Sequence, residues 1–128
     1  MILLLATALG VAQPAAPQLN AREQQAIVVL GRKLGTWRGS ARFSKGLYEC
    51  VTKHSSGDRA IDGVACGALT QCMSRLQPKV DALLAGNPGS KDRELLMQPI
   101  NAELLQCVKT TREEGLRQLA AVRAGANL

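Results

Sequence analysis

The sequence predicts a mainly helical α+β domain, in which an N-terminal helix and a short β-hairpin precede a long antiparallel helical hairpin stapled by disulfides. Two long stretches, 59–85 and from Ser90 onward, carry apolar residues at helical spacing. Before them, residues 37–44 alternate apolar and polar side chains, as a half-buried strand does. The 128 residues suffice for one domain, which we expect to span 20–128.

The sequence opens with an apolar run from Ile2 to Val11. This run is too short to span a membrane, which takes about 20 apolar residues. Small residues precede a cleavage point after Ala12, as in a secretory signal peptide. We expect residues 1–12 to be a signal peptide, with an uncleaved anchor as the alternative. No Lys or Arg precedes the apolar run, which leaves two interpretations, a true start further upstream or a weak export signal. Residues 13–19 hold two prolines and are expected to form an extended linker.

The first helix is expected to begin after Asn20 and to end near Gly35. Asn20 and Glu23 have the spacing of a capping box, in which each side chain accepts from a backbone N–H of the other residue. Apolar residues follow at helical spacing, namely Ile27, Leu30 and Leu34.

A β-hairpin is expected next. The residues expected on its buried face are Trp37, Gly39, Ala41 and Phe43. Ser44–Lys45–Gly46 predicts a tight turn, and residues 47–54 the return strand. A helix is the alternative, because Trp37, Ala41, Ser44, Tyr48 and Val51 would share a helical face. The hairpin is favoured, since each of the three glycines in this region would weaken a helix by about 1 kcal/mol relative to Ala.

The next helix is expected over 59–85, after a break at residues 55–58. Ser56 or Asp58 can cap it. Pro78 lies inside it and predicts a kink or a restart, because proline lacks the backbone N–H. The expected apolar face comprises Ile61, Ala65, Leu69, Cys72, Leu76, Val80 and Leu83 or Leu84.

A final helical segment is expected from Ser90, after turn-forming residues at 86–89. Acidic residues in its first turn favour the positive end of the helix. Pro99 is a candidate break, and fraying is expected after Arg123. The expected apolar stripe comprises Leu104, Cys107 or Val108, Thr111, Gly115, Leu119 and Val122.

The four cysteines predict a disulfide framework, the default for an exported chain. Cys66 and Cys72 would lie about 9 Å apart along one helix, beyond the reach of a bridge. Two pairings remain: Cys50–Cys66 with Cys72–Cys107, or Cys50–Cys72 with Cys66–Cys107. The antiparallel helices do not decide between them, and loop length favours Cys50–Cys66. Zinc ligands usually lie two to four residues apart, so no metal or other cofactor is expected.

The segment from Cys50 to Cys66 reads C-x4-S-S-G-x3-I-D-x3-C and resembles part of the C-terminal domain of TonB-type energy transducers. The resemblance covers about residues 35–75. It implies a strand-turn-helix unit with an edge strand open to β-augmentation, in which a partner segment adds to a sheet. It also favours the Cys50–Cys66 pairing. In that family a further strand follows the helix, whereas here a helical pattern continues, so energy transduction is not expected.

Catalysis is not expected from the cluster of His54, Ser55, Ser56, Asp58 and Asp62. A Ser-His-Asp site is defined by geometry rather than by adjacency in sequence, and the serines and Asp58 suit a capped turn. The sequence holds no P-loop, dinucleotide fingerprint, GxSxG or HExxH motif. The chain is therefore predicted not to be an enzyme.

The amino-acid composition limits which classes of partner the chain could bind. Aromatic residues make up only 2% of the chain, too few to stack nucleic-acid bases, so no nucleic acid is expected. We expect a periplasmic or secreted interaction protein, with another envelope protein as its partner. The alternative is a cationic structural protein in peripheral contact with anionic lipid or cell wall, motivated by the net charge of +6.

Overall fold

A computed structural model describes residues 20–125, and about three quarters of them are helical. The elements are, in order, α1 (Ala21–Thr36), β1 (Arg38–Ser44), β2 (Leu47–His54), α2 (Arg59–Ala85) and α3 (Ser90–Gly125). The signal peptide expected at 1–12 and the linker expected at 13–19 lie outside the described residues.

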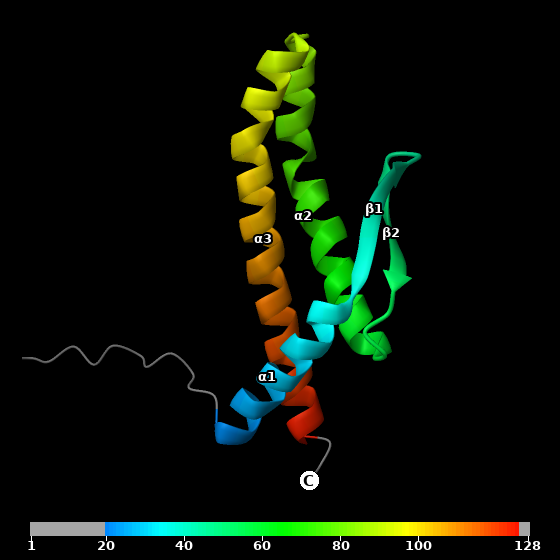
Figure 1. Cartoon of the computed structure of the whole chain (residues 1–128), viewed down its shortest axis with the longest axis vertical. Helices are drawn as coiled ribbons and strands as arrows, with labels where there is room; N and C mark the ends of the chain where they lie inside the picture. Colours follow the sequence, from blue (N-terminus) through cyan, green and yellow to red (C-terminus); the bar gives the residue numbers. More distant parts are fainter. Residues whose placement is uncertain (1–19, 126–128) are drawn as a thin grey trace, which may run out of the picture.

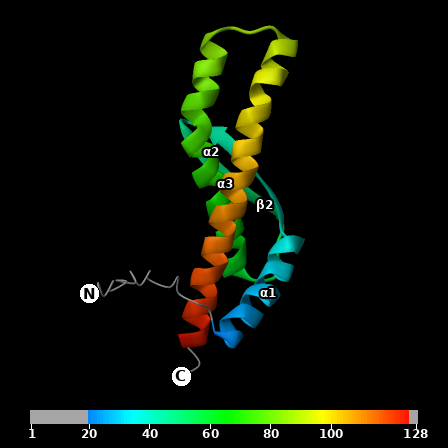
Figure 2. The ribbon, with the colours of Figure 1, turned by 90° about the vertical axis from the view of Figure 1, so that its left-hand side faces the viewer.

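The two long helices form the axis of the molecule. α2 and α3 run antiparallel side by side, and α1 crosses them near the end that is distant from their connecting loop (Figure 1). The two-stranded sheet packs beside α2 (Figure 1). After a quarter turn, α1 lies on one side of the helical pair (Figure 2). α1 and the hairpin therefore cover different parts of the pair: α1 packs mainly on α3, and the hairpin packs on α2.

α1 begins where its cap predicts. Asn20 Oδ1 accepts a hydrogen bond from the backbone N–H of Glu23 at 2.8 Å. The reciprocal half of the capping box differs, because the Glu23 carboxylate accepts from Asn20 Nδ2 at 3.3 Å instead of from the Asn20 backbone. The helix ends at Thr36, and Leu30 is its buried residue. Thus a single cap and one apolar stripe fix both the start and the orientation of α1.

The segment after α1 is an antiparallel hairpin, so the helical alternative is wrong. Lys45 and Gly46 both have positive φ, 52° and 80°, as the two-residue turns that suit twisted hairpins require. The expected apolar face is only partly correct. Trp37 is buried at 5% exposure, but Phe43 is 55% exposed, because α2 covers the base of the hairpin and not its tip.

The core lies where α1, α2 and α3 meet. Its buried members are Leu30, Ile61, Leu116 and Ala120. The stripe expected on α3 is wrong at Val122, which is 69% exposed, and omits Leu116 and Ala120. α3 turns this neighbouring face inward because α1 packs against its flank, a contact that the periodicity of α3 alone does not reveal.

On α2, Ala68 is buried and the expected Leu69 only partly so. Neither proline breaks its helix: α2 passes through Pro78 and α3 through Pro99 without interruption. Both prolines lie on exposed positions, so their rings meet solvent rather than a neighbouring helix. α3 also continues to Gly125, beyond the expected fraying point.

Candidate interaction surfaces

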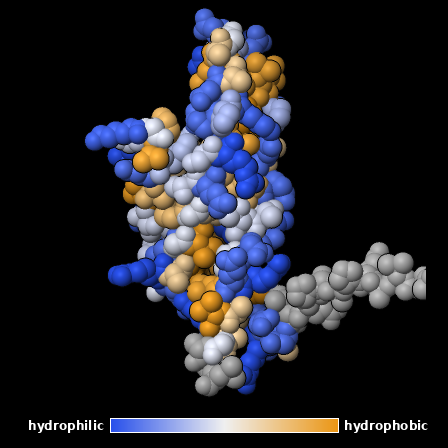
Figure 3. Space-filling view, turned by 180° about the vertical axis from the view of Figure 1, so that it is seen from behind, coloured by the Kyte–Doolittle hydropathy of each residue, from blue (hydrophilic) through white to orange (hydrophobic). Residues whose placement is uncertain are grey.

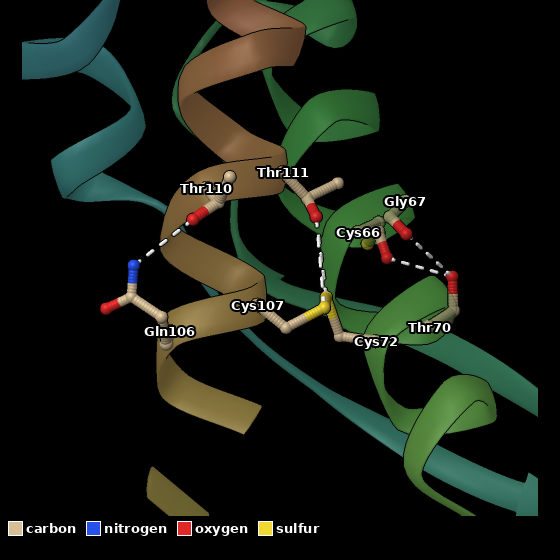
Figure 4. The surroundings of a disulfide bond; sticks show 8 residues. All are labelled: Cys66, Gly67, Thr70, Cys72, Gln106, Cys107, Thr110 and Thr111. Atoms are coloured by element: carbon tan, nitrogen blue, oxygen red, sulfur yellow. Dashed lines mark hydrogen bonds between the residues drawn. A yellow bond between two sulfur atoms is a disulfide. The ribbon is translucent and has the colours of Figure 1, made fainter. Parts of the chain in front are cut away.

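Two disulfides fasten the elements around the hairpin. Cys50 on β2 is bonded to Cys66 on α2, with a Cα–Cα distance of 5.5 Å. Cys72 on α2 is bonded to Cys107 on α3, with a Cα–Cα distance of 5.8 Å (Figure 4). This is the pairing that loop length favours. Disulfides of this kind point to an oxidising compartment outside the cytoplasm.

The base of the hairpin is held by Trp37, which directly precedes β1, and by Thr52 of β2. The Trp37 indole N–H donates to Thr52 Oγ1 at 3.0 Å, and the Arg112 guanidinium of α3 lies 5.4 Å from the centre of the Trp37 ring. Further along, the Tyr48 hydroxyl donates to Gln77 Oε1 on α2. Burial lowers the pKa of Arg112, whose Nε has no hydrogen-bond partner among the described residues. These contacts and the Cys50–Cys66 bridge make the hairpin a fixed platform.

The serines after β2 form a turn around one carboxylate. Ser55 Oγ donates to Asp62 Oδ2 at 2.5 Å, and Ser56 donates to Asp62 Oδ1 through Oγ at 2.6 Å and through N at 2.9 Å. The hydrogen bonds from Ser55 and then Ser56 hold the pKa of Asp62 below its ordinary value. The serine hydroxyls are thus donors to an ionised acid, and no hydrogen bond among the described residues links His54 to either serine.

Asp58 caps α2 and also pairs with a residue near the end of α3. Its Oδ1 accepts from the backbone N–H of Ala60 and Ile61 at 3.0 and 3.4 Å. Arg123 Nη2 donates to both carboxylate oxygens at 2.9 and 2.7 Å, and this bond is the main cause of the lowered pKa of Asp58. The sequence predicts the cap but not the ion pair, since 65 residues separate the two partners.

The hairpin is the whole sheet of the described chain, so each strand has only one paired edge. The turn pairs Ser44 with Leu47, and in an antiparallel ladder every second residue directs its N–H and C=O away from the partner strand. On β1 those residues are Ala41 and Phe43. No hydrogen bond among the described residues engages their outward main-chain groups. The β1 edge therefore carries unpaired main-chain groups within residues 20–125.

A shallow groove of about 690 Å³ runs between α2 and α3 and is lined by residues of these two helices alone. Seen from behind, the molecule shows mainly pale and polar residues around its middle, with apolar groups near its top, on the hairpin at the left and in its lower half (Figure 3). The α2 wall includes Gly63, Gly67 and Arg75, whereas the α3 wall carries longer polar side chains such as Glu103 and Glu114. No sequence motif predicts this groove, because it forms only where residues of α2 and α3 that are distant in the sequence come together.

Within residues 20–125, no group of three or more His, Cys, Asp or Glu side chains could hold a metal ion. No helix in this range is both long and apolar enough to cross a membrane. No family model, curated protein or solved structure matches the chain.

Proposed function

We propose that this chain is an exported, non-catalytic interaction module that binds an extended segment of a partner protein along the β1 edge. The open main-chain groups of Ala41 and Phe43 carry the proposal, because β-augmentation uses such groups for affinity. The anchored base of the hairpin supports it further, since a fixed platform loses little conformational freedom on binding. The resemblance of residues 35–75 to part of the TonB C-terminal domain supports the same interpretation.

The compartment we propose is the periplasm or the cell exterior, with another envelope protein as the partner. The two disulfides support an oxidising environment. A non-catalytic role is supported by the Ser55–Ser56–Asp62 arrangement, in which both hydroxyls donate to a carboxylate whose lowered pKa makes it a weak proton acceptor.

Hydrogen exchange tests the proposal directly. In a complex with a partner purified from envelope extract, the amides of Ala41 and Phe43 should become protected, because they would donate to the added strand. Ala41→Pro removes one outward donor without removing a ladder bond of the hairpin, and should abolish binding while the circular dichroism is retained. The matched control Lys53→Ala should bind normally. A complex that leaves both amides exchanging freely would disprove β-augmentation at this edge.

A second candidate is peripheral binding to an anionic envelope surface, favoured by the charge of +6 and by exposed basic side chains on the hairpin, Arg42, Lys45 and Lys53. It predicts adsorption to phosphatidylglycerol vesicles that weakens as salt is raised, because salt screens exposed charges. Adsorption that is absent, or that does not respond to salt, excludes this candidate.

A further inference from the structure

The face of α2 and α3 that carries the groove has no cover in the described chain. No residue of α1 or of the hairpin lines the groove, and the hairpin reaches α2 through Cys66 and Gln77, which lie outside it. Beyond the groove, toward the loop that connects α2 and α3, the same face continues with apolar residues at helical spacing. These are the exposed Pro78 and Ala82 on α2, and Leu96 and Pro99 on α3. We call this surface, 63–82 of α2 with 96–118 of α3, the back face.

Two glycines on the back face have no packing role among the described residues. Glycine weakens a helix interior relative to alanine, yet a Cβ added at Gly63 or Gly67 would meet nothing within 4 Å. Gly115 on α3 is different, since its Cβ would lie 2.8 Å from Val64, so that glycine is needed for the packing of α2 on α3. Gly63 and Gly67 instead leave a hollow in the α2 wall of the groove.

Each residue of the α2 wall can be assigned a residue of the α3 wall at the same level along the helical pair. Val64 lies against Gly115 and Cys72 is bonded to Cys107, so residues equally distant from the connecting loop lie level. By this rule the hollow at Gly67 lies level with the stretch between Thr110 and Glu114 on α3. The glycines of the α2 wall therefore lie level with long polar side chains of the α3 wall.

Charged side chains also lie level with each other on the two walls of the groove. Arg75, at the upper end of the α2 wall, has no hydrogen-bond or ion-pair partner within residues 20–125. Glu103 lies at nearly the same height on the α3 wall and is paired only with the exposed Lys79, at 2.6 Å. A surface with an unpaired cation on one wall and a carboxylate level with it on the other is complementary to itself.

We propose that the back face is a two-fold interface with a second copy of this chain. With the axis parallel to the helices, α2 of each copy lies over α3 of the other at equal height. Arg75 then faces the Glu103 carboxylate of the other copy, and the hollow at Gly63 and Gly67 receives its Glu114 side chain. Glu114 keeps its own partners, Arg117 and Gln118, which compensate its partial desolvation.

The area is sufficient for a weak dimer. The back face is about 29 Å long, from 19 helical steps of about 1.5 Å, and about 20 Å wide, the width of two helices. It would bury about 600 Å² per copy, at the lower limit for a specific interface. We therefore expect a dissociation constant in the micromolar range. The interface does not depend on the proposed strand binding, because the hairpin lies outside it.

Sedimentation equilibrium of the purified, oxidised protein tests the proposal. The protein should dimerise over micromolar concentrations, and Gly67→Gln, which fills the hollow, should raise the dissociation constant at least about tenfold without lowering the thermal midpoint of the monomer. Arg75→Glu should weaken the dimer by about tenfold as well, and adding Glu103→Arg should restore it. The control Lys53→Glu, on the hairpin, should dimerise normally.

Three results would overturn the proposal. The first is a wild-type protein that stays monomeric up to millimolar concentration. The second is a dimer that tolerates both Gly67→Gln and Arg75→Glu, since it would then use another surface. The third is a loss of the dimer in Lys53→Glu equal to that in Arg75→Glu, which would show a general charge effect. Loss of strand binding with an intact dimer, or the reverse, separates this proposal from that of the β1 edge.

Discussion

Removing the Cys50–Cys66 bridge should destabilise the protein by a predictable amount. The bridge closes a segment of 16 residues, and the loss of chain entropy in the unfolded state corresponds to about 3 kcal/mol. The Cys72–Cys107 bridge closes 35 residues, which corresponds to about 4 kcal/mol. A domain of this size is stable by about 5–15 kcal/mol, so Cys50→Ser/Cys66→Ser should still fold.

Urea unfolding followed by circular dichroism measures this loss. With a slope of about 1.5 kcal/mol/M, the midpoint of Cys50→Ser/Cys66→Ser should fall by about 2 M. The fluorescence of Trp37, the single tryptophan, should report the same transition from the base of the hairpin. Cys72→Ala/Cys107→Ala should lose more, because its loop is longer and Cys72 is fully buried. A loss below about 1 kcal/mol for the first variant, or the reverse ranking, would refute the loop-entropy argument.

Three other substitutions test separate contacts. Asp62→Asn should make the free energy of unfolding less sensitive to acid. Because the pKa of Asp62 is lowered in the folded state, its contribution to stability is complete above the unfolded-state pKa near 4 and is lost as pH falls through the folded-state pKa. An unchanged dependence of stability on pH between pH 5 and 2 would contradict this. Gly39→Ala should destabilise by about 1–3 kcal/mol in urea, because its Cβ would lie 2.3 Å from the Trp37 ring; no loss would show that the ring can move freely. Gly67→Ala should stabilise the monomer by up to about 1 kcal/mol, and a lower thermal midpoint would reveal a contact within the chain.

The contacts that hold the hairpin would also allow the proposed strand binding without rearrangement. Its base is fixed by the Trp37 contacts and the Cys50–Cys66 bridge, and Tyr48 bonds to Gln77 on α2, while Phe43 and Leu47 near its tip remain 55% and 71% exposed. An added strand would lie beside the exposed Phe43. The affinity of such a complex would come from main-chain hydrogen bonds, and its specificity from how the partner covers this ring.

Local signals in the sequence predicted much of the fold. Asn20 and Asp58 are caps, and a cap acts on backbone groups only two or three residues away. The turn at Lys45–Gly46 is equally local, because it depends on the φ angles of two residues. For the same reason the start of α2 and the bounds of β2 agree with expectation.

The errors arose where a neighbour decides the outcome. Val122 and Leu69 fit the helical periodicity of their own segments, but α1 and the hairpin select other faces of α3 and α2 for burial. Pro78 and Pro99 removed one backbone donor each, and packing along the long helical pair keeps both helices continuous. A proline predicts the local cost, but not whether tertiary contacts outweigh it.

The sequence by itself determined the order of the elements and reduced the cysteine pairings to two, because helix caps, turn angles and the rise of a helix are short-range properties. Only the tertiary structure decided which helical faces are buried, joined Asp58 to Arg123, left the β1 edge open and formed the groove between α2 and α3. Each of these features depends on residues far apart in the chain meeting in space. The two surfaces proposed to bind partners both belong to this second group.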